Sequence, residues 1–159
     1  MRNFARSIVL LLALVLSEPV LAGPLQDAHA AYQKQDYATA LRLFRPLADR
    51  GNAKAQAMLG LMYALGQGVP QDHVLAAHWC RLAADQGNAS GQLCLGVLYN
   101  RGTGVPLDFV EAHKWYNLSA AQTQAVNNPA AKSRNHVAEG MTPAQIAEAQ
   151  KRAREWQPQ

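Results

Sequence analysis

The chain contains one sequence pattern twice, and the two copies lie 36 residues apart. The copies share a Leu-Gly pair, a tyrosine, a Gly-x-Gly-Val-Pro loop, an aspartate and a tryptophan at the same spacing. These residues are Leu59, Gly60, Tyr63, Gly66, 68–70, Asp72 and Trp79, and then Leu95, Gly96, Tyr99, Gly102, 104–106, Asp108 and Trp115. A period of this length is typical of repeat proteins, in which each unit is one supersecondary element stacked on the next. The sequence therefore predicts an array of similar units.

Each copy has the signals of two helices separated by a glycine-rich loop. The helices are expected at residues 53–65, 73–85, 89–100 and 108–121. Leu59, Met62 and Tyr63 fall at positions i, i+3 and i+4, which places them on one apolar helix face. Asp72 precedes the second of these helices, and its carboxylate can accept hydrogen bonds from the free N–H groups of the first helical turn. Gly87 follows that helix and suits a left-handed backbone conformation.

Two glycines and two tryptophans recur inside the predicted helices. Gly60 and Gly96 each lower helix stability by about 1 kcal/mol relative to alanine. Their recurrence predicts that the two helices of a unit approach closely at these points, most simply at Ala76 and Ala112. The tryptophans, Trp79 and Trp115, are expected to supply the large apolar side chains between successive helix pairs.

A partial unit precedes the full copies. Residues 28–51 repeat Asp36, Ala40, Ala48 and Gly51 of the second helix but lack the Gly-x-Gly-Val-Pro loop. Terminal units of an array are expected to be atypical, because one side of them faces water. The predicted organisation is a repeat region over 23–126, with a partial unit at 28–51 and full units at 52–87 and 88–123, followed by a C-terminal helical cap at 127–159.

The C-terminal cap has its own helix signals. A short helix is expected at residues 130–138, followed by a second helix that begins at Thr142. Thr142 and Gln145 can form a capping box, and Pro143 suits the first helical position. An apolar stripe then runs along this helix through Ile146, Ala149, Ala153 and Trp156. We expect the stripe to cover the last repeat; the alternative is a free amphipathic helix that binds a partner or a membrane.

The first 22 residues have the pattern of a secretory signal peptide. Arg2 and Arg6 precede the uncharged apolar run 8–16, and Val20-Leu21-Ala22 predicts cleavage after Ala22. The run is shorter than the about 20 residues that span a bilayer. The prediction is a periplasmic or secreted protein that does not span the membrane; the alternative for this segment is a buried N-terminal helix.

Charge and composition exclude some classes of partner. Cleavage after Ala22 would leave 137 residues with a net charge of +3 and both signs mixed along the chain. The basic cluster 151–154 lies between Glu148 and Glu155, which is typical of a solvated helix face. The sequence therefore predicts no nucleic-acid partner.

No motif for metal binding or catalysis stands out. His73 and His78 are five residues apart, so they lack the i, i+4 spacing of a helical metal site, and no cofactor is expected. The sequence lacks Gly-x-Ser-x-Gly and Ser-x-x-Lys, and its Gly-x-Gly loops lack the lysine of a phosphate-binding loop. Helix capping explains the repeated Asp72 and Asp108. We therefore predict a protein that is not an enzyme.

The repeated residues resemble those of the Sel-one-like repeat (SLR) family, which is related to the tetratricopeptide repeats. The resemblance covers about residues 28–156, and the second full unit departs from the family pattern at Gly91, Ser119 and Thr123. It implies an all-α fold, a right-handed α-α superhelix of antiparallel helix pairs whose first helices line a concave face. It also implies an adaptor or scaffold, often in the envelope or in host interactions for exported members.

Cys80 and Cys94 are the two cysteines of the chain. They lie on predicted neighbouring helices, each seven residues from Gly87, and an oxidising compartment would permit a disulfide. A bridge closing this loop would contribute about 3 kcal/mol. The alternative is two buried free thiols, if helix rotation points the side chains apart.

The resemblance also assigns candidate binding residues to the concave face. They are the first-helix residues outside the core stripe: Lys54, Ala57, Leu61, Leu65, Ser90, Leu93, Val97 and Arg101. The prediction is an exported interaction module that binds a peptide or helix of an envelope or secreted partner in this groove. One alternative is a cell-envelope enzyme or a protein that binds β-lactams or muropeptides. Another is an assembly factor acting through the convex face or the terminal helix.

Overall fold

The computed structural model describes residues 23–122, 125 and 127–159, and every regular element in them is an α-helix. Eight helices follow one another: α1 (Pro24–Gln33), α2 (Tyr37–Asp49), α3 (Ala53–Leu65), α4 (His73–Asp85), α5 (Ala89–Arg101), α6 (Phe109–Ala121), α7 (Pro129–Ala138) and α8 (Pro143–Glu155). The predicted signal peptide, residues 1–22, lies outside the described residues. The all-helical prediction is confirmed, and the helix bounds agree with the predicted ones to within one residue.

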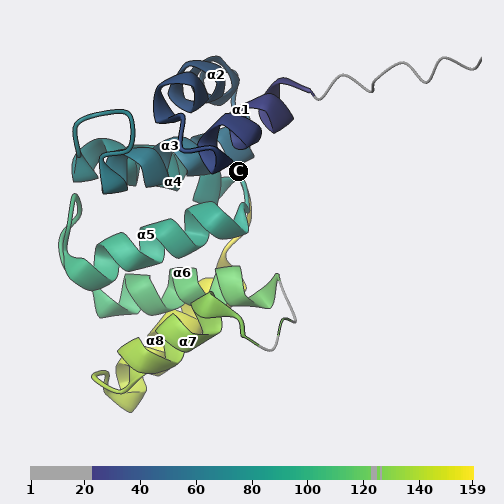
Figure 1. The fold of residues 1–159 in the computed structure, drawn as a ribbon. Helices are drawn as coiled ribbons and strands as arrows, with labels where there is room; N and C mark the ends of the chain where they lie inside the picture. Colours follow the sequence, from purple (N-terminus) through teal and green to yellow (C-terminus); the bar gives the residue numbers. More distant parts are fainter. Residues whose placement is uncertain (1–22, 123–124, 126) are drawn as a thin grey trace, which may run out of the picture.

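The helices pack as a stack of pairs (Figure 1). The pairs α1–α2, α3–α4 and α5–α6 follow in order, and each pair also contacts the next through α2–α3 and α4–α5. The helices α7 and α8 both pack on α6, so they close the end of the stack. Every helix in the described ranges falls short of the length and hydrophobicity that a membrane span requires.

Caps and loop glycines set the helix ends as the sequence predicts. The Asp72 carboxylate accepts hydrogen bonds from Val74 N and Leu75 N, both at 2.9 Å. Gly87 has a φ of 83°, which is the left-handed conformation expected after α4. At α8, the side chain of Thr142 and that of Gln145 form both hydrogen bonds of a capping box.

The two interior glycines lie at close helix crossings within each pair. A Cβ atom added at Gly60 would come 3.2 Å from the carbonyl oxygen of Ala76. At Gly96 the corresponding distance to the Ala112 carbonyl oxygen is 3.3 Å. The predicted close approach is therefore present in both full units. The predicted alanines are among the contacts, and the side chains of Cys80 and Tyr116 lie nearer still.

The tryptophans occupy equivalent positions in the stack. Trp79 is buried in one cluster with Ala48 and Leu59. Trp115 is buried in another with Ala84 and Leu95, which are the residues 36 positions later. Both rings therefore fill the junction between one helix pair and the next, as predicted.

A buried amide network also follows the repeat. Gln56 Nε2 donates to Ala48 O at 3.1 Å, and Gln92 Nε2 donates to Ala84 O at 3.4 Å. Gln86 Nε2 in turn donates to Gln56 Oε1 at 2.7 Å. Because an unpaired buried amide is unfavourable, these bonds favour one register between successive units.

The chain end returns to the middle of the stack after α8. Trp156 packs edge-on against Trp115, with ring centroids 6.1 Å apart. Gln159 N then donates to Asp85 O at the end of α4, at 2.8 Å. Helix α8 is thus packed against the repeats, and the alternative of a free amphipathic helix is not the arrangement of this structure.

Candidate binding groove

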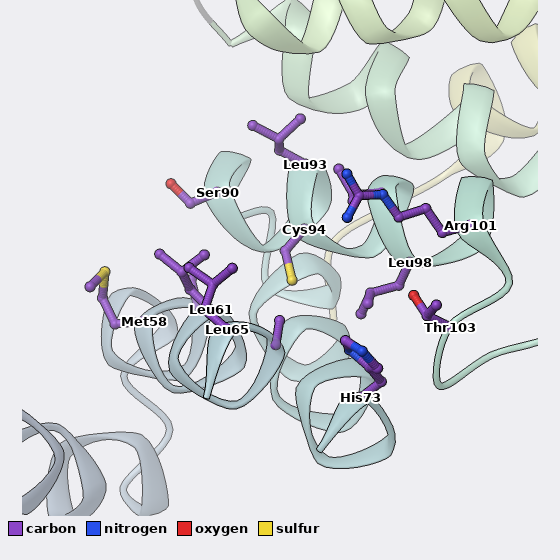
Figure 2. A pocket seen from close by; sticks show the side chains of 13 residues that line it. Met58, Leu61, Leu65, His73, Ser90, Leu93, Cys94, Leu98, Arg101 and Thr103 are labelled. Carbon is purple, nitrogen blue, oxygen red and sulfur yellow. The ribbon is translucent and has the colours of Figure 1, made fainter. Parts of the chain in front are cut away.

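A hollow of about 390 Å³ lies between α3 and α5, the first helices of the two full units (Figure 2). The two helices occupy equivalent places in successive units, so residues 36 positions apart take corresponding places along it. Leu61 on α3 thus corresponds to Val97 on α5, and Leu65 corresponds to Arg101. The volume is within the range of about 300–1,000 Å³ that ligand pockets occupy in proteins.

The structure brings together seven of the eight predicted groove residues. They are Ala57, Leu61, Leu65, Ser90, Leu93, Val97 and Arg101. The eighth, Lys54, lines an adjoining hollow of about 510 Å³ that shares Ser90 with the first. The two hollows adjoin at Ser90, and together they extend from Lys54 at the start of α3 to Arg101 at the end of α5; we call them the groove. Their role in binding stays a prediction.

Six further residues line the hollow, and the sequence did not assign them to it. They are Met58, Ala64, His73, Cys94, Leu98 and Thr103. Met58 and Leu98 neighbour predicted positions, and a wider helical face would have included them. His73 comes from α4 and Thr103 from the loop after α5, so the repeat pattern of the first helices could not have identified them.

The groove is apolar, with polar groups at its ends. Leu65 is 55% exposed in the hollow, although a leucine side chain is stabilised by burial. Arg101 stands at one end, where its positive charge partly offsets the effect of burial that raises the pKa of Tyr116. His73 Nδ1 is buried without a hydrogen-bond partner in the described part of the chain.

Cys80 and Cys94 form a disulfide beside the groove. Their Cα atoms are 6.0 Å apart, and the bridge joins α4 to α5. Cys94 lines the hollow and Cys80 is fully buried. The predicted bridge is confirmed, and the alternative of two free thiols is wrong for this structure.

Gly91 gives a physical reason for the short distance between α4 and α5. A Cβ atom at this position would come 2.5 Å from Ala83 Cβ and 2.8 Å from Ala84 N. Gly91 therefore lets the first turn of α5 lie against α4, one turn before Cys94. The departure from the family pattern at this residue has a structural role that sequence reasoning missed.

A second buried histidine lies away from the groove. His113 on α6 is 3% exposed, and its Nδ1 has no hydrogen-bond partner among the described residues. Burial, together with the positive charge of Arg134, lowers the pKa of His113. Burial therefore disfavours the protonated form of this side chain.

The described residues contain no group of three or more His, Cys, Asp and Glu side chains that could hold a metal ion. In the groove, the hydroxyl groups of Ser90 and Thr103 make no hydrogen bond to His73 within the described ranges. The arrangement is that of a surface that buries apolar side chains.

Comparison with known proteins gives a match to one repeat family and to solved structures. The Sel1 repeat model matches residues 27–52, 53–88 and 89–123, so it covers the partial unit as well as both full units. A crystal structure of c5321, a protective antigen of uropathogenic Escherichia coli with an SLR fold, is similar with a TM-score of 0.75 and 29% identity over 84% of this chain. A Sel1 repeat protein from Oxalobacter formigenes is similar with a TM-score of 0.66 and 29% identity, also over 84% of this chain.

This chain spans 29% of the Escherichia coli protein and 56% of the Oxalobacter protein. No match was found among curated proteins. The three matched repeats cover more than half of the sequence, and the chain therefore belongs to the Sel1 repeat family.

Proposed function

We propose that this protein is an exported interaction module that binds a peptide segment or helix of an envelope or secreted partner in the groove between α3 and α5. The observation that carries the proposal is the apolar hollow built from equivalent residues of two successive units. Sel1 repeats generally mediate protein interactions and are typically non-catalytic. Grooves of this kind bind segments through a few apolar anchors.

Export is supported by three observations. The Cys80–Cys94 disulfide belongs to a class of bond that persists in oxidising compartments. The sequence of residues 1–22 has the order of a signal peptide, with arginines before an apolar run. The similar protein from Escherichia coli is a protective antigen, which accords with an exported role.

Site-specific photo-crosslinking tests the groove directly. A photoreactive amino acid replaces Leu65, which is 55% exposed in the groove, or Val74, which is 67% exposed and lines none of the hollows described above. We expect a discrete crosslinked partner in the native envelope from position 65 and none from position 74. Crosslinks of equal yield at both positions would contradict the proposal.

Two charge insertions provide an independent test. Leu61→Asp and Val97→Asp place a carboxylate in the centre of the apolar hollow, so they should abolish capture of the crosslinked partner. Val74→Asp is the matched control, because this exposed residue lies on α4 outside the groove. All three variants should keep the helical spectrum of the parent. Unchanged partner capture by Leu61→Asp would rule out the groove as the binding site.

A further inference from the structure

We infer that the groove takes an extended, acidic segment: a stretch of partner chain with an apolar centre and an Asp or Glu side chain at each end. This inference rests on the proposed function and adds the chemistry and the conformation of the partner. Three features of the groove carry it: the sign of its charges, their separation and the size of the hollow between them.

The charged groups of the groove are all positive. Arg101 lines one hollow and Lys54 the adjoining one, and no Asp or Glu among the described residues lines either. Neither cation takes part in an ion pair or side-chain hydrogen bond within the described part of the chain. Opposite charge on a partner is therefore attracted to both ends, and positive charge is repelled.

The two cations stand at opposite ends of an apolar floor. Lys54 is the second residue of α3, and Arg101 is the last residue of α5, at the position equivalent to Leu65. At a rise of 1.5 Å per residue, the two positions are about 16 Å apart along the helix axis. An extended chain covers this length in about five residues. A free chain end would meet one cation alone, so two acidic side chains match the groove better.

The size of the hollow favours an extended chain over a helix. Helices α3 and α5 contact each other, so the hollow of about 390 Å³ is a furrow between neighbouring helices. The body of a helix about 10 Å across does not fit between two helices in contact. Apolar side chains that alternate along an extended segment can enter the furrow.

Two synthetic peptides test the charge. One has the sequence Glu-Ala-Leu-Ala-Leu-Ala-Glu and the other Lys-Ala-Leu-Ala-Leu-Ala-Lys, both acetylated and amidated so that the termini carry no charge. In an extended chain this spacing places both charged side chains and both leucines on one face. We expect the full chain to bind the glutamate peptide about tenfold more tightly than the lysine peptide in titration calorimetry at low salt, with the difference reduced at 0.5 M salt. Equal affinities, or no binding of either peptide, would overturn the inference.

Charge reversal in the protein tests the ends separately. Arg101→Glu and Lys54→Glu should each weaken binding of the glutamate peptide about fivefold, and the double variant should prefer the lysine peptide. The matched controls are Arg154→Glu in the last turn of α8 and Lys132→Glu in the first turn of α7, which should change nothing. If the double variant still preferred the glutamate peptide, the assignment of the two cations would be wrong.

Two further measurements separate this inference from the proposed function. Leu61→Asp should abolish binding of the glutamate peptide. If Leu61→Asp abolishes binding but charge reversal at Lys54 and Arg101 has no effect, the groove binds segments and the inferred acidic chemistry is wrong. A longer peptide with its glutamates eleven residues apart on a helix should bind less tightly than the short one. Tighter binding of that helix, or of a neutral peptide with a free C-terminal carboxylate, would overturn the inference.

Discussion

At the scale of residues, small side chains decide how closely the helices lie. Gly60 and Gly91 both occupy positions where a methyl group would overlap a neighbouring helix, with the nearest atoms at 2.3 Å and 2.5 Å. Alanine would be the better helix former at each place by about 1 kcal/mol. Glycine is favoured here because packing contributes more than helix propensity.

Gly60→Ala is predicted to destabilise the protein by about 1–3 kcal/mol, in spite of the gain in helix propensity. The added Cβ would lie 2.3 Å from Cys80 Sγ and 3.1 Å from Cys80 N, and neither atom can move freely. The free energy of unfolding from urea denaturation measures the effect. Gly140→Ala is the control, because its nearest neighbour is 3.8 Å away. Equal stability of the two variants would show that the crossing tolerates a methyl group.

His113 predicts a dependence of stability on pH. Its pKa is lowered in the folded state, so the unfolded chain binds the proton more readily. Stability is therefore unaffected above the ordinary pKa of about 6.5 and falls as the pH drops below it. His113→Gln should reduce the difference in unfolding free energy between pH 7.5 and pH 5. His78→Gln, at an exposed position, should leave that difference as in the parent; an unchanged difference in His113→Gln would contradict the assignment.

At the scale of elements, several interactions join α4 to α5. Three features act on this junction together: the close approach at Gly91, the hydrogen bond from the Gln92 side chain to Ala84 O, and the Cys80–Cys94 bridge. Helix α5 lines the groove, and α4 contributes His73 to it. The disulfide therefore limits how far α5 can move relative to the unit before it.

Removing the disulfide is predicted to lower the free energy of unfolding by about 3 kcal/mol, because the unfolded chain loses a loop constraint. Guanidinium unfolding with and without reductant measures this change. The double variant Cys80→Ala, Cys94→Ala should unfold at the same midpoint with or without reductant. Two alkylated thiols in the intact mass of the unreduced parent would contradict the bridge.

At the scale of the whole molecule, the C-terminal segment ties the end of the stack to its middle. Glu111 on α6 accepts from Arg152 Nη1 at 3.0 Å and from Trp115 Nε1 at 3.1 Å, which holds α8 in place. Trp156 and the residues after it then reach the turn around Gly87. The C-terminal segment thus contacts two repeat units and also closes the end of the array (Figure 1).

Trp156→Ala is predicted to lower global stability by about 2 kcal/mol, since the half-buried ring packs against Trp115 and near Gly87. Thermal unfolding followed by circular dichroism measures the loss. Gln157→Ala, one residue later and exposed, should be neutral. A Trp156→Ala transition at the parent temperature would show that the tail does not contribute to the stack.

The sequence by itself determined the repeat, the helix bounds, the caps at Asp72 and Thr142 and the crossing at Gly60. Each of these is a local or periodic signal. The resemblance to the SLR family, carried by the same repeat, predicts that the groove residues lie on the first helices.

Tertiary structure decided what depends on the rotation and distance of helices. From the sequence alone, Cys80 and Cys94 can be bridged or free. The close approach of α4 and α5 at Gly91 brings the two side chains together as a bridge. The contribution of His73 to the groove and the return of Trp156 to the turn at Gly87 arise from residues distant in sequence. Periodicity indicates which face of a helix is buried, but the partner of that face follows from packing among all the units.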